Sequence, residues 1–408
     1  MKNNFKFDVI LTFLVQILVA ISNFVILFYI TRYMGTEDYG EFYLIKRVSD
    51  LLWVSLLLGL TVSIPRNIHK VNNIFSILIT GVIVASVSIL IIIFLPSHII
   101  SFFIGEIKFV SIFKVLVISQ IIFGIINSIQ RGLEQFINYN VFNIINFIFN
   151  PLLSLYFSND LYSYLYHLAY ISLFTNISIF LITTIIICKR QKECKINKND
   201  TKYILKYGLS RIPGLVLASF IFTLPIFLMD LFNQHTLKGI VSQIFQMYSL
   251  VLLPINTLGT LILPKISKAI FTNDRQLYNK LYSKLFKLNL IVVLTSILLL
   301  IVIPVILFLA NNNYNFEYYH IIIIIGILPL AFYNLYRNPI DALSEKPITT
   351  YIVLFSFIIS FILFTIVRYI PDVNYEWLIS VYVLILYTLL GSLTFFVFKI
   401  INRRYMNG

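Results

Sequence analysis

The stretch that decides the fold is residues 34–70, which read MGTEDYGEFYLIKRVSDLLWVSLLLGLTVSIPRNIHK. An acidic turn leads into an apolar segment that is long enough to cross a bilayer, and this segment carries Lys46, Arg47 and Asp50 near its middle. A charged residue well inside a membrane-spanning helix costs roughly 2.5–3.5 kcal/mol on insertion, so such residues usually face a bundle interior or a water-filled cavity. We therefore expect this segment to be a cavity helix and not a plain membrane anchor.

The rest of the chain has the composition of a polytopic membrane protein. Of its 408 residues, 59% are hydrophobic and 12% are charged, and the mean hydropathy is +0.90. A helix needs about 20 apolar residues to cross a hydrocarbon core of about 30 Å. The pattern predicts an all-α protein with twelve spans, at residues 8–33, 41–64, 73–95, 107–130, 139–158, 162–188, 203–231, 239–264, 283–309, 319–336, 347–370 and 376–400.

The net charge of +14 is distributed unevenly across the predicted membrane. Most Lys and Arg residues fall in the termini and in the loops on the side of the N-terminus, whereas the other side holds Arg32, Lys108, Lys238 and Arg368. Such an excess marks the cytoplasmic side of a membrane protein. The charge therefore predicts a multi-pass protein with both termini in the cytoplasm, and it gives no reason to expect a nucleic-acid partner.

A basic polar stretch, KRQKECKINKNDTK at residues 189–202, divides the predicted helices six and six. It has no apolar periodicity, which is typical of a linker. The spacing from Gly40 to Pro65 recurs from Gly239 to Pro264, and a basic residue follows each proline. We therefore predict an N-lobe at 1–188, a basic cytoplasmic linker at 189–202 and a C-lobe at 203–408. Parallel repeats of this kind occur in transporters.

No predicted loop is long enough to hold a soluble catalytic or nucleotide-binding domain, and the chain has no phosphate-binding P-loop motif. We therefore expect a protein that is not an enzyme and that binds no cofactor. The five histidines are scattered over loops and helix ends, and none forms a pair with the spacing of metal ligands.

Several predicted helices carry polar side chains three, four or seven residues apart, which places them on one face. One interpretation is that these amides join helices, with each hydrogen bond contributing roughly 0.6–2 kcal/mol. The other is that they line a cavity and bind a polar ligand. The candidates for this second role are Gln16, Asn23, Asn127, Asn146, Asn150, Gln246 and Asn256.

Charged residues within the spans are harder to explain by helix packing alone. Asp50 lies three residues from Arg47 and four from Lys46, so a local ion pair is one explanation for this trio. Arg211 has no acidic neighbour on its own helix, so it needs either a partner on another helix or an anionic ligand. Lys114, two turns into the fourth span, is a further candidate.

Five segments, taken in order along the chain, resemble the bacterial polysaccharide and O-antigen repeat-unit flippases (Wzx-type) of the multidrug/oligosaccharidyl-lipid/polysaccharide exporter superfamily. They are RYMGTEDYGEF at 32–42, SLLLGLTVSIPR at 55–66, LKYGLSRIPG at 205–214, YSLVLLPINTLGTLILPKISKA at 248–269 and RNPIDALSEKPITT at 337–350. The resemblance implies two parallel six-helix lobes around a central cavity, a MATE-like exporter fold. Twelve spans fit repeat-unit flippases better than the fourteen expected of peptidoglycan-precursor flippases.

The resemblance also implies a function in the bacterial inner membrane. The expected substrate is an oligosaccharide on undecaprenyl pyrophosphate, which would move from the cytoplasmic to the outer leaflet by alternating access for lipopolysaccharide or capsule synthesis. We expect Arg211, Lys46, Arg47 and Lys114 to make the cavity electropositive, with Arg32 and Arg66 at its outer and inner mouths. Membrane lipids and other polysaccharide assembly proteins are the expected partners.

Two sources of energy are consistent with this function. The membrane potential would drive an anionic substrate outward, and coupling to Na⁺ or H⁺ would use an internal carboxylate, for which Asp50 is the candidate. A multidrug or other lipid-linked exporter of the same fold is the alternative function. A membrane polysaccharide polymerase or ligase is a more distant one, because the outer loops are short and poor in basic residues.

Overall fold

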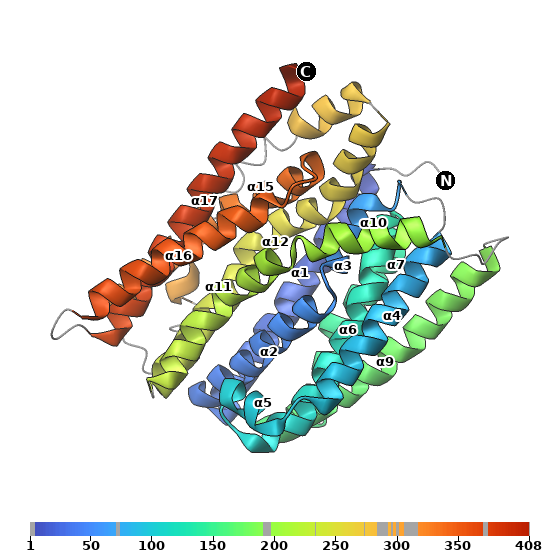
Figure 1. The fold of residues 1–408 in the computed structure, drawn as a ribbon. Helices are drawn as coiled ribbons and strands as arrows, with labels where there is room; N and C mark the ends of the chain where they lie inside the picture. Colours follow the sequence, from blue (N-terminus) through green and yellow to red (C-terminus); the bar gives the residue numbers. More distant parts are fainter. Residues whose placement is uncertain are drawn as a thin grey trace. The chain divides into compact units, whose positions relative to one another are not determined.

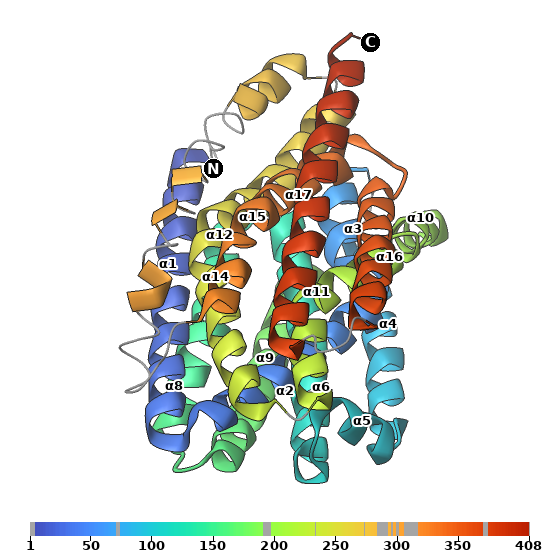
Figure 2. The same cartoon turned by 90° about the vertical axis from the view of Figure 1, so that its left-hand side faces the viewer.

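The computed structural model describes residues 5–70, 74–190, 197–232, 234–272, 274–283, 317–369 and 374–407, together with 293–294, 297–298 and 302–305. All regular elements within these residues are helices. By contacts the chain forms two compact units, which are Met1–Ile26 with Glu41–Ser219, and Leu27–Gly40 with Phe220–Gly408. The helices of both units are drawn in Figures 1 and 2.

The apolar composition predicts the membrane-spanning helices well. Eight helices in the described part of the chain are long and apolar enough to cross a membrane, and a bent pair adds a ninth if it counts as one span. The eight are Ile10–Met34, Ile74–Phe94, Ile107–Gly132, Leu161–Lys189, Ile212–Leu231, Tyr319–Leu343, Ile348–Arg368 and Tyr375–Tyr405. The count of twelve stays a prediction, and the span expected at 283–309 lies largely outside the described residues.

The first unit contains most of α1 (Phe5–Tyr29) and α2 (Thr36–Leu56), followed by a series of shorter and longer helices. These are α3 (Leu60–Asn67), α4 (Ile74–Phe94), α5 (Ser97–Ile104), η2 (Ile107–Phe109), α6 (Val110–Gly132), α7 (Phe136–Ile144), η3 (Ile145–Phe149), α8 (Asn150–Tyr156), α9 (Leu161–Arg190) and α10 (Lys198–Leu209). α9 packs along α6, and α10 contacts α3 and α4 (Figure 1).

The predicted second span is not one straight helix. α2 ends at Leu56, α3 begins at Leu60, and the two are bent by 54°. Leu58 and Gly59 have φ angles of 52° and 73°, in the left-handed region, which costs a non-glycine residue roughly 1–2 kcal/mol. The Ser88 hydroxyl donates to the Leu56 carbonyl at 2.8 Å, so one backbone acceptor exposed by the break has a partner.

The predicted seventh span is also divided. α10 ends at Leu209, and α11 (Ile212–Leu231) begins after Ser210 and Arg211. Pro213 falls in the first turn of α11, where the missing N–H of proline has no helical partner to lose. The sequence signal of Gly208 and Pro213 therefore indicates a helix boundary, and α10 becomes a separate short helix.

Gly208 allows α10 to touch the break between α2 and α3. A Cβ atom built on Gly208 would lie 2.5 Å from the Leu58 carbonyl oxygen and 3.2 Å from the Gly59 carbonyl carbon. Both neighbours are backbone atoms, so they cannot rotate away. The contact requires glycine for reasons of space.

Gly208→Ala is therefore expected to destabilise the protein by about 1–3 kcal/mol, the usual cost of overpacking. Thermal unfolding in detergent would measure the loss. Leu209→Ala is the matched control, because Leu209 is the next residue on α10 and its side chain is 49% exposed. Equal stability of the two variants would contradict the close contact.

The second unit contains η1 (Ile30–Met34), most of α11, and α12 (His235–Phe271), α14 (Tyr318–Ile325), α15 (Ile327–Leu343), α16 (Ile348–Arg368) and α17 (Tyr375–Asn407). α15 packs against both α12 and α17, and α16 packs along α17 (Figure 2). Tyr248 on α12 is fully buried and donates its hydroxyl proton to the Ile323 carbonyl.

Positions related by the sequence repeat meet in this unit. A Cβ atom built on Gly40 would lie 3.0 Å from the Gly239 nitrogen, and the Thr236 hydroxyl donates to Glu37 at 3.1 Å. Each pair has the same separation in sequence, 199 residues. Contacts between equivalent positions are what a two-fold relation between repeats produces near its axis.

Candidate functional site

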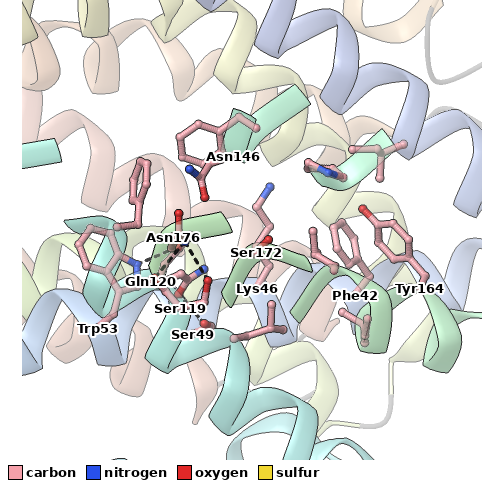
Figure 3. Close-up of a pocket in the computed structure, with 18 of the residues that line it drawn as sticks. Phe42, Lys46, Ser49, Trp53, Ser119, Gln120, Asn146, Tyr164, Ser172 and Asn176 are labelled. Carbon is pink, nitrogen blue, oxygen red and sulfur yellow. Dashed lines mark hydrogen bonds between the residues drawn. The ribbon is translucent and has the colours of Figure 1, made fainter. Parts of the chain in front are cut away.

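A cavity of about 840 Å³, which includes space open to solvent, lies within the first unit. Its walls come from α1, α2, α6, η3, α8 and α9. Figure 3 shows amide, hydroxyl and aromatic side chains pointing toward it. We name this space the N-unit cavity and define it by the residues that line it.

One face of α2 supplies the most varied group of lining residues. Phe42, Lys46, Ser49, Asp50 and Trp53 are spaced by three or four residues, apart from the adjacent Ser49 and Asp50, so they share a helix face. The Ser49 hydroxyl donates to Gln120 Oε1 of α6 at 2.5 Å, which ties the two helices together. The cavity helix expected from residues 34–70 is therefore present, and α2 is the part that carries it.

Opposite polar groups come from α6 and α9. Tyr164, Leu168, Ser172 and Asn176 of α9 line the cavity at intervals of four residues. Asn176 donates its amide to Ser119 of α6, at 3.1 Å to the carbonyl oxygen and 2.9 Å to the hydroxyl. These bonds hold Asn176 in place, and its side chain is 1% exposed.

Two deeply buried polar atoms at the cavity have no hydrogen-bond partner among the described residues. They are Oδ1 of Asn176 and the hydroxyl of Tyr164, whose side chain is fully buried. A buried polar atom without a partner is costly, so such atoms usually bind water or a ligand. Both atoms suit a ligand rich in hydroxyl groups.

Lys46 is the cation of the N-unit cavity. Its ammonium lies 5.8 Å from the centre of the Phe42 ring, within the range of a cation–π contact. Within the part of the chain that the structure describes, no hydrogen bond or ion pair to this ammonium is found. Figure 3 places Lys46 between Asn146 on one side and Phe42 with Tyr164 on the other. The cavity thus presents a positive charge that an anion can reach.

Asp50 and Arg47 form the local ion pair that their spacing predicts. Asp50 Oδ2 lies 3.6 Å from Arg47 Nη1, and Asp50 Oδ1 accepts a hydrogen bond from the Trp53 indole at 3.1 Å. Arg47 also donates to the Tyr43 hydroxyl at 2.6 Å. Asp50 lines the N-unit cavity, whereas Arg47 is not among its lining residues.

Arg66 and Arg211 lie together, away from the N-unit cavity. Both side chains are 2% exposed, and both guanidinium groups contact the ring of Tyr207, at 4.7 Å for Arg66 and 3.4 Å for Arg211. Arg66 donates to Asn67 Oδ1 at 2.9 Å. The structure therefore places these two predicted cations where α3 meets the end of α10, and their role at a pyrophosphate stays a prediction.

The other two predicted cations lie elsewhere. Lys114 donates to the Ile93 carbonyl at 2.9 Å, near the C-terminal end of α4, where a cation interacts favourably with the helix dipole. Arg32 is exposed in η1, in the second unit. Neither residue lines the N-unit cavity.

The predicted amides also separate into groups. Asn23 and Asn146 line the N-unit cavity, and Asn146 projects from the π-helical segment η3 while donating to the Phe142 carbonyl at 3.1 Å. Asn150 is buried and donates to Ser172 and Thr175 of α9, which is the helix-joining role. Gln16 and Asn127 do not line the cavity, and Gln246 is buried in the second unit. The side chain of Asn256 lies outside the described part of the chain.

Sequence reasoning missed several lining residues. Among them are Trp53, which carries no charge to mark it in an apolar segment, and Asn176, which lies in a helix rich in Ile, Leu and Phe. The four-residue interval between Ser172 and Asn176 is the signal that could have identified this face. Gln120 of α6 also lines the cavity.

The arrangement suits binding of a polar anionic molecule and lacks the usual features of a metal centre. In the described ranges, no group of three or more His, Cys, Asp or Glu residues is placed to hold a metal ion. The amides and hydroxyls can bind sugar hydroxyl groups, the Trp53 and Phe42 rings can pack against sugar rings, and Lys46 can neutralise a phosphate.

Solved structures with a similar fold are MATE transporters. An outward-facing multidrug resistance MATE family transporter of the MOP superfamily aligns with a TM-score of 0.69 at 12% identity, covering 100% of this chain and 98% of that one. The inward-facing form of a multidrug resistance MATE family transporter of that superfamily gives 0.65 at 12% identity, with 94% of each chain covered. The MATE multidrug transporter DinF-BH gives 0.70 at 14% identity, covering 99% and 96%. This likeness shows that the chain has a MATE-like fold.

The comparison of sequences identifies the family. A search of curated proteins found no match. The family model described as "Polysaccharide biosynthesis protein" matches residues 6–270, which is more than half of the chain and includes every residue of the N-unit cavity. With its MATE-like fold, the chain thus belongs to the polysaccharide biosynthesis protein family, the Wzx-type exporters of the MOP superfamily.

Proposed function

We propose that this protein is a flippase for oligosaccharide repeat units linked to undecaprenyl pyrophosphate, which it moves from the cytoplasmic to the outer leaflet of the bacterial inner membrane. The units would belong to an O-antigen or a capsule. The observation that carries the proposal is the Lys46 ammonium, which lies among amides and aromatic rings at the N-unit cavity and has no hydrogen bond or ion pair among the described residues.

The proposed substrate matches the chemistry of this cavity in two ways. Asn176 and Tyr164 offer buried polar atoms that sugar hydroxyl groups can satisfy, and Trp53 offers an aromatic face. Lys46 offers a positive charge for the pyrophosphate, where a charge-assisted hydrogen bond is roughly twice as strong as a neutral one. The polyprenyl tail needs no polar partner and would stay in the bilayer.

The orientation in the proposal comes from the distribution of charge. Basic residues concentrate on the side of both termini and of the linker, which by the positive-inside rule is cytoplasmic. A substrate with about two negative charges would gain roughly 4.6 kcal/mol in leaving a cytoplasm that is negative by about 100 mV. Coupling to Na⁺ or H⁺ through Asp50 is the second proposed source of energy. Asp50 already pairs with Arg47 and Trp53, so a bound cation would compete with these contacts.

The alternative function is export of drugs, because the similar structures are those of multidrug transporters. Many multidrug substrates are cations, and a cation would be repelled by Lys46 at the N-unit cavity. This charge favours an anionic substrate. A polymerase or ligase is not favoured by any feature of the described residues.

Reconstitution into proteoliposomes tests the proposal. With a lipid-linked oligosaccharide in one leaflet, we expect faster movement to the other leaflet than in protein-free vesicles, and a further increase when the side that holds the substrate is made about 100 mV negative. The lipid that reaches the outer face can be counted by an enzyme that modifies exposed sugars. Transport of cationic dyes without movement of the lipid-linked sugar would instead establish the drug exporter.

A further inference from the structure

A second cavity in the first unit has no residue in common with the N-unit cavity. It measures about 550 Å³, which includes space open to solvent, and lies where the turn between α6 and α7 meets the first residue of α4 and the last turns of α9. Its polar lining includes Gln130, Asn138 and Thr183, and its apolar lining includes Ile74 and Ile186. We call it the α6–α7 pocket.

Gln130 is the residue that marks this pocket as a binding site. Its side chain is 4% exposed and lines the pocket, yet its Oε1 atom has no hydrogen-bond partner among the described residues. A backbone hydrogen bond closes the turn, because the backbone N–H of Gln135 donates to the backbone carbonyl of Gln130 at 2.9 Å. A buried acceptor without a partner is costly, and a donor that enters the pocket beside Gln130 can satisfy it.

The apolar side of the pocket borders a surface suited to lipid. Ile186 is 44% exposed, and the neighbouring Ile182 on α9 and Ile137 on α7 are 57% and 56% exposed. In a membrane-spanning unit, large exposed apolar side chains of this kind face hydrocarbon. A ligand of the pocket must therefore combine a polar group that donates a hydrogen bond with an apolar part.

Positive charge lies one turn beyond the apolar wall. Lys189, which is exposed, lies in the last turn of α9, just after Ile186 and Ile187. This order along the helix, an apolar wall followed by a cation, matches the order of acyl chain and phosphate in a membrane lipid. Asn138, which donates to Gln135 at 3.3 Å, adds a polar rim.

We propose that the α6–α7 pocket binds a glycerophospholipid of the membrane, with a hydrogen-bond donor of its headgroup on Gln130 Oε1, its phosphate toward Lys189, and an acyl chain along Ile186. The donor is a hydroxyl in a glycerol headgroup or an ammonium in an ethanolamine headgroup. Choline lacks such a donor. The site does not depend on which substrate the protein transports.

Lipid binding to the full-length, delipidated protein tests this site, with native mass spectrometry as the readout. Phosphatidylglycerol and phosphatidylethanolamine with identical acyl chains should bind about 5-fold more tightly than phosphatidylcholine, the effect of roughly one hydrogen bond. Gln130→Met keeps the length of the side chain but removes the acceptor, and it should lower both affinities to that of phosphatidylcholine. Comparison of the affinities for phosphatidylglycerol and phosphatidylethanolamine shows whether a hydroxyl or an ammonium is the better donor to Gln130.

A second variant keeps the test decisive if Gln130→Met fails to fold. Thr183→Phe should fill the pocket and abolish the headgroup preference, whereas Ser178→Phe, on the same helix but outside the pocket, should leave it intact. Equal affinity of the unmodified protein for all three lipids would mean that the pocket holds water only. A preference that survives both Gln130→Met and Thr183→Phe would place lipid selection elsewhere. Either outcome overturns the proposal.

Discussion

Replacing Lys46 by glutamine is expected to slow translocation of the lipid-linked oligosaccharide by at least about tenfold. A hydrogen bond to a charged group contributes roughly 1.5–3 kcal/mol, and its loss at the pyrophosphate corresponds to about 10–100-fold in affinity. Glutamine retains most of the length of the side chain, and Lys46 makes no hydrogen bond within the described part of the protein that its removal would break. Stability should therefore change little. The rate in proteoliposomes and the melting temperature in detergent measure the two quantities.

Two further variants test whether the effect comes from a positive charge at the N-unit cavity or from the loss of any positive charge in the protein. Lys114→Gln removes the same charge from a lysine outside the N-unit cavity, where its partner is the Ile93 carbonyl, and should leave transport near normal. Lys46→Arg keeps the charge and should retain part of the activity. Normal transport by Lys46→Gln would refute the role of Lys46, and with it the observation on which the proposed function rests.

Arg211→Ala is expected to lower stability by about 2–4 kcal/mol and so to reduce the amount of folded protein. The side chain is 2% exposed and stacks on Tyr207 at 3.4 Å, so truncation removes a cation–π contact and leaves a void between packed helices. Its guanidinium also reaches the Tyr207 carbonyl at 3.4 Å. Size-exclusion chromatography and thermal unfolding in detergent would show the loss.

Arg211→Lys distinguishes this structural role from the cavity role predicted by the sequence. Lysine keeps the positive charge but lacks the flat guanidinium that stacks on the ring, so it should recover only part of the stability. A role at the pyrophosphate predicts a different result, in which Arg211→Ala folds normally and fails to transport. The two measurements on one pair of variants therefore decide between the interpretations.

The sequence predicts the helices well because hydropathy over about 20 residues decides whether a segment enters a bilayer. It does not predict where a helix breaks inside such a segment. Leu57, Leu58 and Gly59 read as part of one apolar run, and the α10 backbone at Gly208, which packs against the break, is distant in the sequence. Pro213 was a better local signal, because proline favours the first turn of a helix.

The candidate site is less predictable than the helices. The spacing of residues along a helix shows which side chains share a face, but it does not show which other helix that face contacts. Lys46 and Asp50 were found from their charge within an apolar segment, and both line the N-unit cavity. Arg211 was selected for the same reason, yet it packs on Tyr207 four residues earlier. Asn176 was missed because its importance comes from a contact with Ser119 on another helix.

The contact between Gly40 and Gly239 has a consequence for the history of the chain. If the two halves descend from one duplicated ancestor, each inherited the same small residue, and the copies now touch. A Cβ atom on Gly239 would lie 2.9 Å from the Thr36 carbonyl carbon, and one on Gly40 would lie 3.1 Å from the Gly239 Cα. The nearest of these neighbours are backbone atoms of the other half, so neither glycine can acquire a side chain unless that backbone moves. At this point the two halves must evolve as one.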